Sequence, residues 1–345
     1  MRHRVTLLSL ACALASLGSM ALGADPPKYH VARKIEVGGE GGWDYLIVDS
    51  AARRLYVSRS TRVIVLDADT GSVVGEIPNT EGVHGIAIAP ELGRGFTSNG
   101  RASTITIFDL KTLKTLGDPV KSTGENPDAI LYDPASRRVF AFNGRTGNAT
   151  AIDAATGQVA GTVVLEGRPE FATSDGAGRI FVNLEDKSAI AVIDSRKLTV
   201  EKRWPLAPCE EPSGMAMDRE HKRLFVGCSN KLMAVVDFSS GKVVATVPIG
   251  EGVDANAYDP KTGLAFSSNG DGTLTIARAD GKDKYVVAQT VETQKRGKTM
   301  ALDEKTHRVF VPAAQFGPPP PPTTQTPRPR PSMVPGSFVI LVLES

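Results

Sequence analysis

"LYDPASRRVFAFNG", residues 131–144, has close counterparts elsewhere in the chain. They read "AMDREHKRLFVGCS" at 216–229 and "AYDPKTGLAFSSNG" at 257–270. Each copy holds an Asp, a short polar stretch and then an apolar segment with an aromatic residue. A segment that recurs at a fixed period is one supersecondary unit used several times, so the period of this repeat decides the fold.

Aligning the copies over the whole chain gives seven units. The Asp position, once a Pro, recurs at steps of 41, 43, 42, 43, 41 and 44 residues: Asp49, Pro90, Asp133, Asp175, Asp218, Asp259 and Asp303. An aromatic residue follows six or seven residues later in every unit: Tyr56, Phe96, Phe140, Phe181, Phe225, Phe266 and Phe310. A period in the low forties with strand-like content is typical of a β-propeller. We therefore predict seven blades, with the aromatic residues packed between adjacent blades.

The pattern inside each unit indicates four short strands joined by hairpins. Asn-Gly pairs at 99–100, 143–144 and 269–270 mark tight turns, and no segment shows helical periodicity. The predicted fold class is all-β, a seven-bladed propeller with four-stranded antiparallel blades. The seventh unit lacks its last strand, whereas residues 29–39 precede the first unit with no blade of their own. We expect residues 31–37 to pair with residues 338–343, which would close the ring and leave no open sheet edge.

The first 24 residues have the features of a secretory signal peptide. Arg2 and Arg4 precede an apolar stretch, Val5 to Leu17, that is too short to span a bilayer, and small residues follow up to Gly23. Cleavage near residues 23–24 would leave residues 25–345 as a single propeller domain, periplasmic or secreted. It would remove two of the 40 basic residues and none of the 38 acidic ones, so the mature chain has no net charge. A neutral chain lacks the basic field that favours nucleic-acid binding.

Two cysteines, Cys209 and Cys228, remain after cleavage. An exported protein can oxidise such a pair to a disulfide. Pro208 and Pro212 bracket Cys209 and could bend the chain enough to bring the sulfurs together. The alternative is two buried, unpaired thiols.

The repeat resembles a known family. The segments "RLYVSRS" at 54–60, "RVFAFNG" at 138–144 and "RIFVNLE" at 179–185 are similar to the YVTN-type repeat of YncE-like secreted seven-bladed propellers. The resemblance covers essentially the whole mature chain. It implies the fold, and because the matching residues belong to the scaffold it implies little about function.

The candidate site follows from propeller geometry, in which the first strand of every blade lines the central channel. The residue five before the repeat Asp opens each first strand: Asp44, Gly85, Asp128, Glu170, Ser213, Asp254 and Lys298. Trp43 and His84 come directly before two of these positions. We expect Trp43, Asp44, His84, Asp128, Glu170, Asp254 and Lys298 to form a ligand-binding site at the channel mouth. The four acids could also bind a cation such as Ca²⁺, and no other cofactor is indicated.

These residues leave three functions open. The first is a binding module for a protein, a peptide or a small envelope ligand, with no chemistry of its own. The second is a divalent-cation-dependent hydrolase or lactonase that acts in the acidic mouth. The third is single-stranded nucleic-acid binding, for which Trp43, Arg59, Arg101 and Arg145 offer a few groups. Binding without catalysis is favoured because no catalytic motif is present, and we expect a monomer that is not embedded in a membrane.

Residues 317–336, "GPPPPPTTQTPRPRPSMVPG", interrupt the seventh unit. Their proline content favours an extended, solvated loop. The segment is either a disordered insertion or a docking arm for a partner, with Arg328 and Arg330 as contacts.

Overall fold

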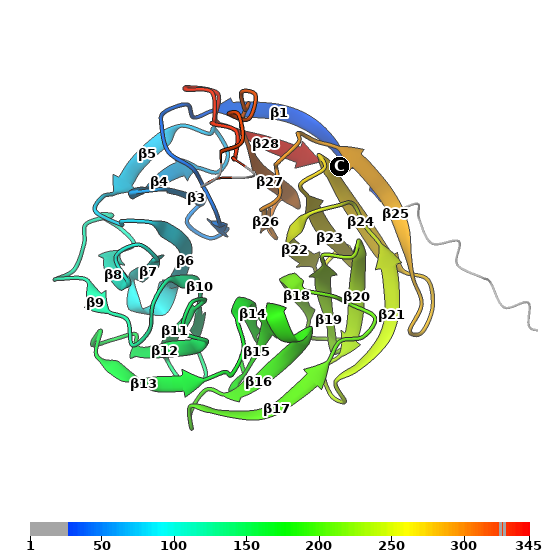
Figure 1. Ribbon diagram of the computed structural model, residues 1–345, viewed down its shortest axis with the longest axis horizontal. Helices are drawn as coiled ribbons and strands as arrows, with labels where there is room; N and C mark the ends of the chain where they lie inside the picture. The colour runs from blue at the N-terminus through cyan, green and yellow to red at the C-terminus, as the bar shows by residue number, and fades with distance from the viewer. Residues whose placement is uncertain (1–26, 324–325, 327–328) are drawn as a thin grey trace, which may run out of the picture.

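Seven four-stranded antiparallel sheets surround a central axis in the computed structural model (Figure 1). The structure describes residues 27–323, 326 and 329–345. The predicted fold class is confirmed. The predicted signal peptide lies outside the described residues. In the described part of the chain, no helix is long and apolar enough to cross a membrane.

The blades follow one another along the chain, each running from an inner to an outer strand. Blade 1 comprises β2 (Leu46–Asp49), β3 (Arg54–Arg59), β4 (Arg62–Asp67) and β5 (Val73–Ile77). Blade 2 comprises β6 (Val83–Ala89), the short 3₁₀-helix η1 (Pro90–Leu92), β7 (Arg94–Asn99), β8 (Thr104–Asp109) and β9 (Val120–Lys121). Blade 3 comprises β10 (Pro127–Asp133), β11 (Arg138–Asn143), β12 (Asn148–Asp153) and β13 (Val159–Val164).

Blade 4 comprises β14 (Pro169–Ser174), β15 (Arg179–Leu184), the 3₁₀-helix η2 (Glu185–Lys187), β16 (Ala189–Asp194) and β17 (Thr199–Pro205). Blade 5 comprises β18 (Pro212–Asp218), β19 (Arg223–Cys228), β20 (Leu232–Asp237) and β21 (Lys242–Pro248). Blade 6 comprises β22 (Val253–Asp259), β23 (Leu264–Asn269), β24 (Thr273–Ala279) and β25 (Tyr285–Glu292). Blade 7 comprises β26 (Ala301–Asp303), β27 (Arg308–Ala313), β28 (Val339–Glu344) and, as its outer strand, β1 (His30–Glu36).

The ring closes between the two ends of the chain. Strand β1 lies antiparallel to β28, with His30 opposite Glu344 and Glu36 opposite Val339 (Figure 1). The predicted pairing of residues 31–37 with 338–343 is therefore confirmed. Closure matters because an open blade would leave unpaired backbone groups along β28 and expose the apolar residues beneath it.

The recurring aromatic residues hold neighbouring blades together. All seven are at most 1% exposed to solvent, and each lies in a cluster with residues of the following blade. Phe140 of blade 3, for example, packs with Ile180 and Val182 of blade 4. Phe310 of blade 7 packs with Leu55 and Val57 of blade 1, so the set runs round the complete ring.

The recurring Asp caps the turn after the inner strand, and in several blades it also contacts a neighbouring blade. The Asp133 carboxylate accepts hydrogen bonds from Ser136 N, 3.0 Å away, and from Ser174 Oγ of blade 4, 2.6 Å away. Blade 2 differs, because its turn contains the helix η1 and needs no Asp cap. Ala87 lies opposite Phe96 as Leu131 lies opposite Phe140, so Ala89 occupies the position that corresponds to Asp133. The alignment of Pro90 with that position was wrong by one residue.

The proline-rich insertion leaves blade 7 between β27 and β28, and its base is ordered. Phe316 forms an isolated antiparallel bridge with Met333, and Gly317 N donates to the Ser332 carbonyl at 2.9 Å. The insertion is thus anchored to the propeller at both ends. Arg330 is exposed, whereas Arg328 lies outside the described residues.

Candidate functional site

Seven residues occupy the same position at the start of the seven inner strands. We call this set the collar: Asp44, His84, Asp128, Glu170, Ser213, Asp254 and Lys298. The corrected register of blade 2 places His84 in the ring instead of Gly85. His84 is therefore a full member of the collar and not a neighbour in the connecting loop. The collar lies at the end of the channel where each blade is entered and where the second and third strands of each blade are joined.

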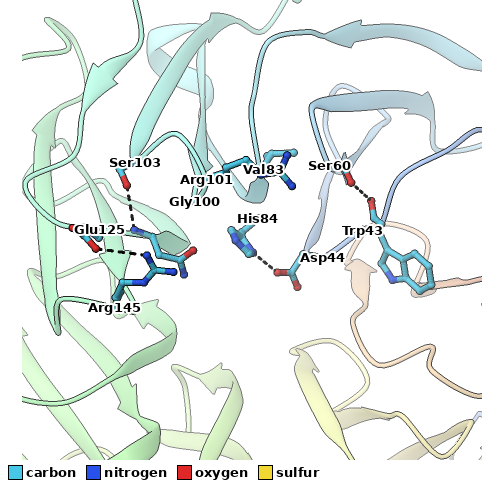
Figure 2. Close-up of a pocket in the computed structure, with 13 residues that line it drawn as sticks. Trp43, Asp44, Ser60, Val83, His84, Gly100, Arg101, Ser103, Glu125 and Arg145 are labelled. Carbon is cyan, nitrogen blue, oxygen red and sulfur yellow. Dashed lines mark hydrogen bonds and ion pairs between the residues drawn. The ribbon is translucent and has the colours of Figure 1, made fainter. Parts of the chain in front are cut away.

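Two sides of the collar are held by ion pairs. His84 Nδ1 lies 2.6 Å from Asp44 Oδ2 (Figure 2). The same nitrogen lies 3.5 Å from Asp128 Oδ1. Burial alone would lower the pKa of His84, but the hydrogen bond with Asp44 and the charges of Asp128 and Asp44 raise this pKa to about 9. Protonated at neutral pH, His84 thus binds two carboxylates supplied by the blades on either side of its own.

The other cation of the collar is Lys298. Its Nζ lies 2.6 Å from Asp254 Oδ2. Ser213 Oγ donates a second hydrogen bond to Asp254 Oδ1 at 3.2 Å. Asp254 is thereby partnered on both carboxylate oxygens.

Glu170 is left without a cationic partner among the described residues. Burial, and then the charges of the carboxylates around it, led by Asp128 and Asp254, raise the pKa of Glu170 to about 8. The nearby guanidinium of Arg168 pairs with Glu185 instead, at 2.5 Å. With four acids against one Lys and one His, the collar has more negative than positive groups. It therefore favours a positively charged group supplied from outside.

Two aromatic rings lie directly beneath the collar. Tyr45 follows Asp44 and Phe171 follows Glu170, and their ring centroids are 5.5 Å apart although they belong to blades 1 and 4. Burial first, and then the charges of Asp128, Glu170 and the other collar acids, raise the pKa of Tyr45 well above 10. The pair forms the floor of the mouth and separates the collar from the rest of the channel.

An open pocket of about 630 Å³ lies on the mouth side of the collar, over blades 1 to 3. Asp44 and His84 line it together with Ser60, Arg101 and Arg145 (Figure 2). A smaller pocket of about 280 Å³ shares Asn126 and Arg145 with the first one and adds Asp128, Arg168 and Glu170. The mouth thus offers carboxylates and guanidinium groups side by side.

Trp43 lines the larger pocket, but its ring packs mainly against blade 7. It lies 5.0 Å from the ring of Phe338 and 6.1 Å from that of Phe316, centroid to centroid. Phe316 stands at the base of the proline-rich insertion. Trp43 therefore packs between the base of the insertion and the mouth, and the main contacts of its ring are with the protein itself.

Arg59 is fully buried and supports the loop that carries Asp44. Its guanidinium donates to the carbonyls of Gly38 at 3.0 Å, Glu40 at 3.1 Å and Gly41 at 2.5 Å, and it stacks on Phe338 at 3.9 Å. The loop needs glycine, because Gly38, Gly39 and Gly41 all have positive φ angles of 64°, 72° and 92°. Arg59 is consequently unable to contact a ligand such as a nucleic acid.

One group of potential metal ligands occurs among the described residues. Asp44, His84 and Asp128 each offer an atom within 4.8 Å of the others. The sequence pointed to Asp44, Asp128, Glu170 and Asp254 as the candidates. The structure brings only the first two into this group and adds His84, while Asp254 is occupied by Lys298.

Cys209 and Cys228 form a disulfide in the structure, with Cα atoms 5.4 Å apart. Cys209 N donates to the Leu206 carbonyl at 2.8 Å, which makes the bend that brings the sulfurs together. The bond ties the exposed loop of Glu210 and Glu211, which leads into blade 5, to the end of β19.

Sequence reasoning missed Tyr45, Phe171 and the role of Arg168 at the mouth. Their position in the repeat could have indicated them. Tyr45 and Phe171 each follow a collar acid, whereas the other blades carry smaller residues such as Gly85 and Ala129 at that position. Large side chains at that position point to a filled channel.

The comparisons with known proteins agree with the fold. No protein-family model matches the chain, and no curated protein matches it significantly. Among solved structures, hydrazine synthase of Kuenenia stuttgartiensis is similar, with a TM-score of 0.69 and 14% sequence identity. The match covers 78% of this chain and 92% of that chain. The class of protein is therefore a seven-bladed β-propeller, an architecture consistent with a binding module.

Proposed function

We propose that this chain is an exported propeller of the YncE-like, YVTN-repeat type that binds short peptides at its channel mouth. Membership of that type is supported by the repeat segments such as "RVFAFNG" and by the closure of seven blades. Export is supported by the basic and apolar leader at residues 1–24. The observation that carries the binding proposal is Glu170, the collar carboxyl group that forms no ion pair among the described residues and whose pKa is raised by burial and by the carboxylates around it.

A basic side chain of the peptide would bind at Glu170 and Asp128. An ammonium group there would replace the missing counterion and would favour the ionised form of both carboxyl groups. Since the pKa of Glu170 is about 8 without such a group, binding would release a proton near neutral pH. Affinity should therefore rise as the pH rises from 6 to 9, a range over which a lysine side chain keeps its charge.

A carboxylate of the peptide would bind at the arginines of the mouth. Arg145 lines both pockets, and Arg101 lines the larger one. Arg145 is exposed and its contact with Glu125, also exposed, is 3.7 Å long, so the pair is weak and open to exchange. Guanidinium groups bind carboxylates through paired hydrogen bonds, which would fix the direction of the peptide.

The test uses three matched peptides in isothermal titration calorimetry. N-acetyl-Lys-Ala-Ala carries both charges, its norleucine analogue lacks the ammonium group, and its C-terminal amide lacks the carboxylate. We expect both changes to weaken binding about tenfold, and we expect Glu170→Gln and Arg145→Ala to do the same, because each removes one charged hydrogen bond. Glu220→Gln, at the opposite end of blade 5, is the control and should bind normally. No binding, or equal binding of all three peptides, contradicts the proposal.

A divalent-cation-dependent hydrolase or lactonase is the second candidate, and the group Asp44, His84 and Asp128 favours it. A cation held there would polarise a carbonyl group of the substrate. The first proposal keeps the ion pair of His84 with Asp44, at 2.6 Å, which a cation in this group would have to replace. Elemental analysis of protein purified without chelator decides between them. A stoichiometric metal that is lost in His84→Ala would support the hydrolase.

A further inference from the structure

The channel continues beneath Tyr45 and Phe171 as an apolar chamber of about 360 Å³. Its wall is formed mainly by the inner strands of blades 1 to 4. The side chains that make it apolar include Ile47, Ile86, Ile88, Ile130, Leu131 and Met300. A mainly apolar cavity of this size lies in the range typical of small-molecule sites.

The chamber is separate from the mouth and opens at the other end of the channel. None of the seven collar residues lines it, whereas Pro134, Gly176 and Arg219, from turns that follow the inner strands, do. A second pocket of about 260 Å³ shares Ile47, Thr173 and Arg219 with the chamber and extends to Leu302 and Glu304. A ligand could thus enter from the face that carries these turns without passing the collar.

Arg219 stands at this entrance with most of its hydrogen-bonding capacity unused. It follows Asp218 at the end of β18, and its Nη2 donates to the carbonyl of Ser174 in blade 4 at 2.7 Å. Within the described residues this is its one hydrogen bond, and it makes no ion pair with a carboxylate. A guanidinium has five N–H donors, so Arg219 is held in position and still has donors available.

Other arginines on the same face are differently placed. Arg53 pairs with Asp69 and Asp303, each at 2.6 Å, and Arg223 pairs with Asp283 at 2.5 Å. Those arginines fasten one part of the scaffold to another. Arg219, in contrast, lies over the end of the channel. Among the described residues no carboxylate pairs with its guanidinium group.

We propose that the lower chamber binds a small apolar monocarboxylate, with the carboxylate on Arg219 and the apolar body inside the chamber. Paired hydrogen bonds from a guanidinium suit a carboxylate, and the chamber removes the apolar body from water. Glu304 at the outer edge is exposed and forms no ion pair within the described residues, so it weakens the attraction without blocking it. This site is independent of the proposed peptide site.

Calorimetry with three six-carbon probes tests the proposal: hexanoate, hexan-1-ol and hexylamine, which share an apolar body and differ in charge. We expect hexanoate to bind most tightly. Arg219→Ala should weaken hexanoate at least tenfold, and Arg219→Lys should retain part of the affinity, because a lysine keeps the charge but loses the paired geometry. Glu304→Gln is the matched control, and it should bind hexanoate as well as or better than the wild type.

A second variant tests the location. Thr173 is partly buried where the chamber meets the outer pocket, and Thr173→Phe would fill that space. This variant should lose hexanoate binding while its melting temperature stays close to that of the wild type. Equal affinity for the three probes, undiminished binding in Arg219→Ala, or no hexanoate binding at millimolar concentration would overturn the proposal.

Discussion

Tyr45 and Phe171 contact each other across the central channel, with ring centroids 5.5 Å apart, although they come from blades 1 and 4. In a ring of seven blades these two stand on opposite sides. The contact divides the channel into an acidic mouth and an apolar chamber, so one propeller can hold two chemically different sites.

The Tyr45 phenol should resist ionisation. Its pKa is raised well above 10 by burial and by the collar carboxylates. We expect the Tyr45→Phe protein to show the same phenolate absorbance as the wild type up to about pH 10.5, because Tyr45 does not contribute there. In Phe171→Ala the hydroxyl gains access to water, and an additional tyrosine should then titrate. Loss of phenolate signal in Tyr45→Phe below that pH would contradict this assignment.

Glu170 should make stability depend on pH. Its folded pKa of about 8 lies above its ordinary value of 4.5, so the folded state binds more protons than the unfolded state between these values. The contribution of Glu170 to stability is therefore fully present below pH 4.5 and is lost as the pH rises to 8. Glu170→Gln should stabilise the protein on the order of 2 kcal/mol at pH 8.5 and have little effect at pH 4.5. Urea unfolding at both pH values measures this, and an equal effect at both would refute it.

Arg59 should be essential for the loop that carries Asp44. Arg59→Met keeps an apolar stem but leaves the carbonyls of Gly38, Glu40 and Gly41 without their donor. We expect a loss of about 3 kcal/mol or more in the free energy of unfolding, because buried acceptors that lose a charged donor are costly. Arg62→Met is the control, since its ion pair with Glu76 is long, at 3.6 Å, and partly exposed. That variant should lose less than about 1 kcal/mol.

The closing strand β1 should stabilise the folded protein through its pairing with β28. Removing residues 27–36 deletes β1, exposes the edge of β28 and uncovers core residues of blade 7 such as Leu341 and Leu343. We expect a lower melting temperature and a greater tendency to aggregate, because an unpaired edge strand is a template for association. Scanning calorimetry and light scattering check both effects. An unchanged melting temperature would show that β1 is dispensable.

The repeat made most of the fold predictable from the sequence. The aromatic residue of each unit fills the space against the next blade. Because every blade needs this residue, it recurs in the sequence at the period of one blade. The one misaligned unit is instructive. The Asp recurs because it caps a turn, whereas blade 2 makes the same turn with η1 and has no Asp there. The sequence alignment therefore matched Pro90, instead of Ala89, with the Asp position. That shift of one residue put Gly85 in the collar in place of His84.

The sequence by itself determined the seven blades, the strand that closes them and the set of acids at the channel mouth, because each depends on local pattern or on the count of units. Only the tertiary structure decided which of those acids are partnered: His84 lies between Asp44 and Asp128, Lys298 pairs with Asp254, and Glu170 is left over. It also decided that Tyr45 meets Phe171. These contacts join residues that are distant in the chain, and their geometry is set by the diameter of the closed ring, which no single repeat contains.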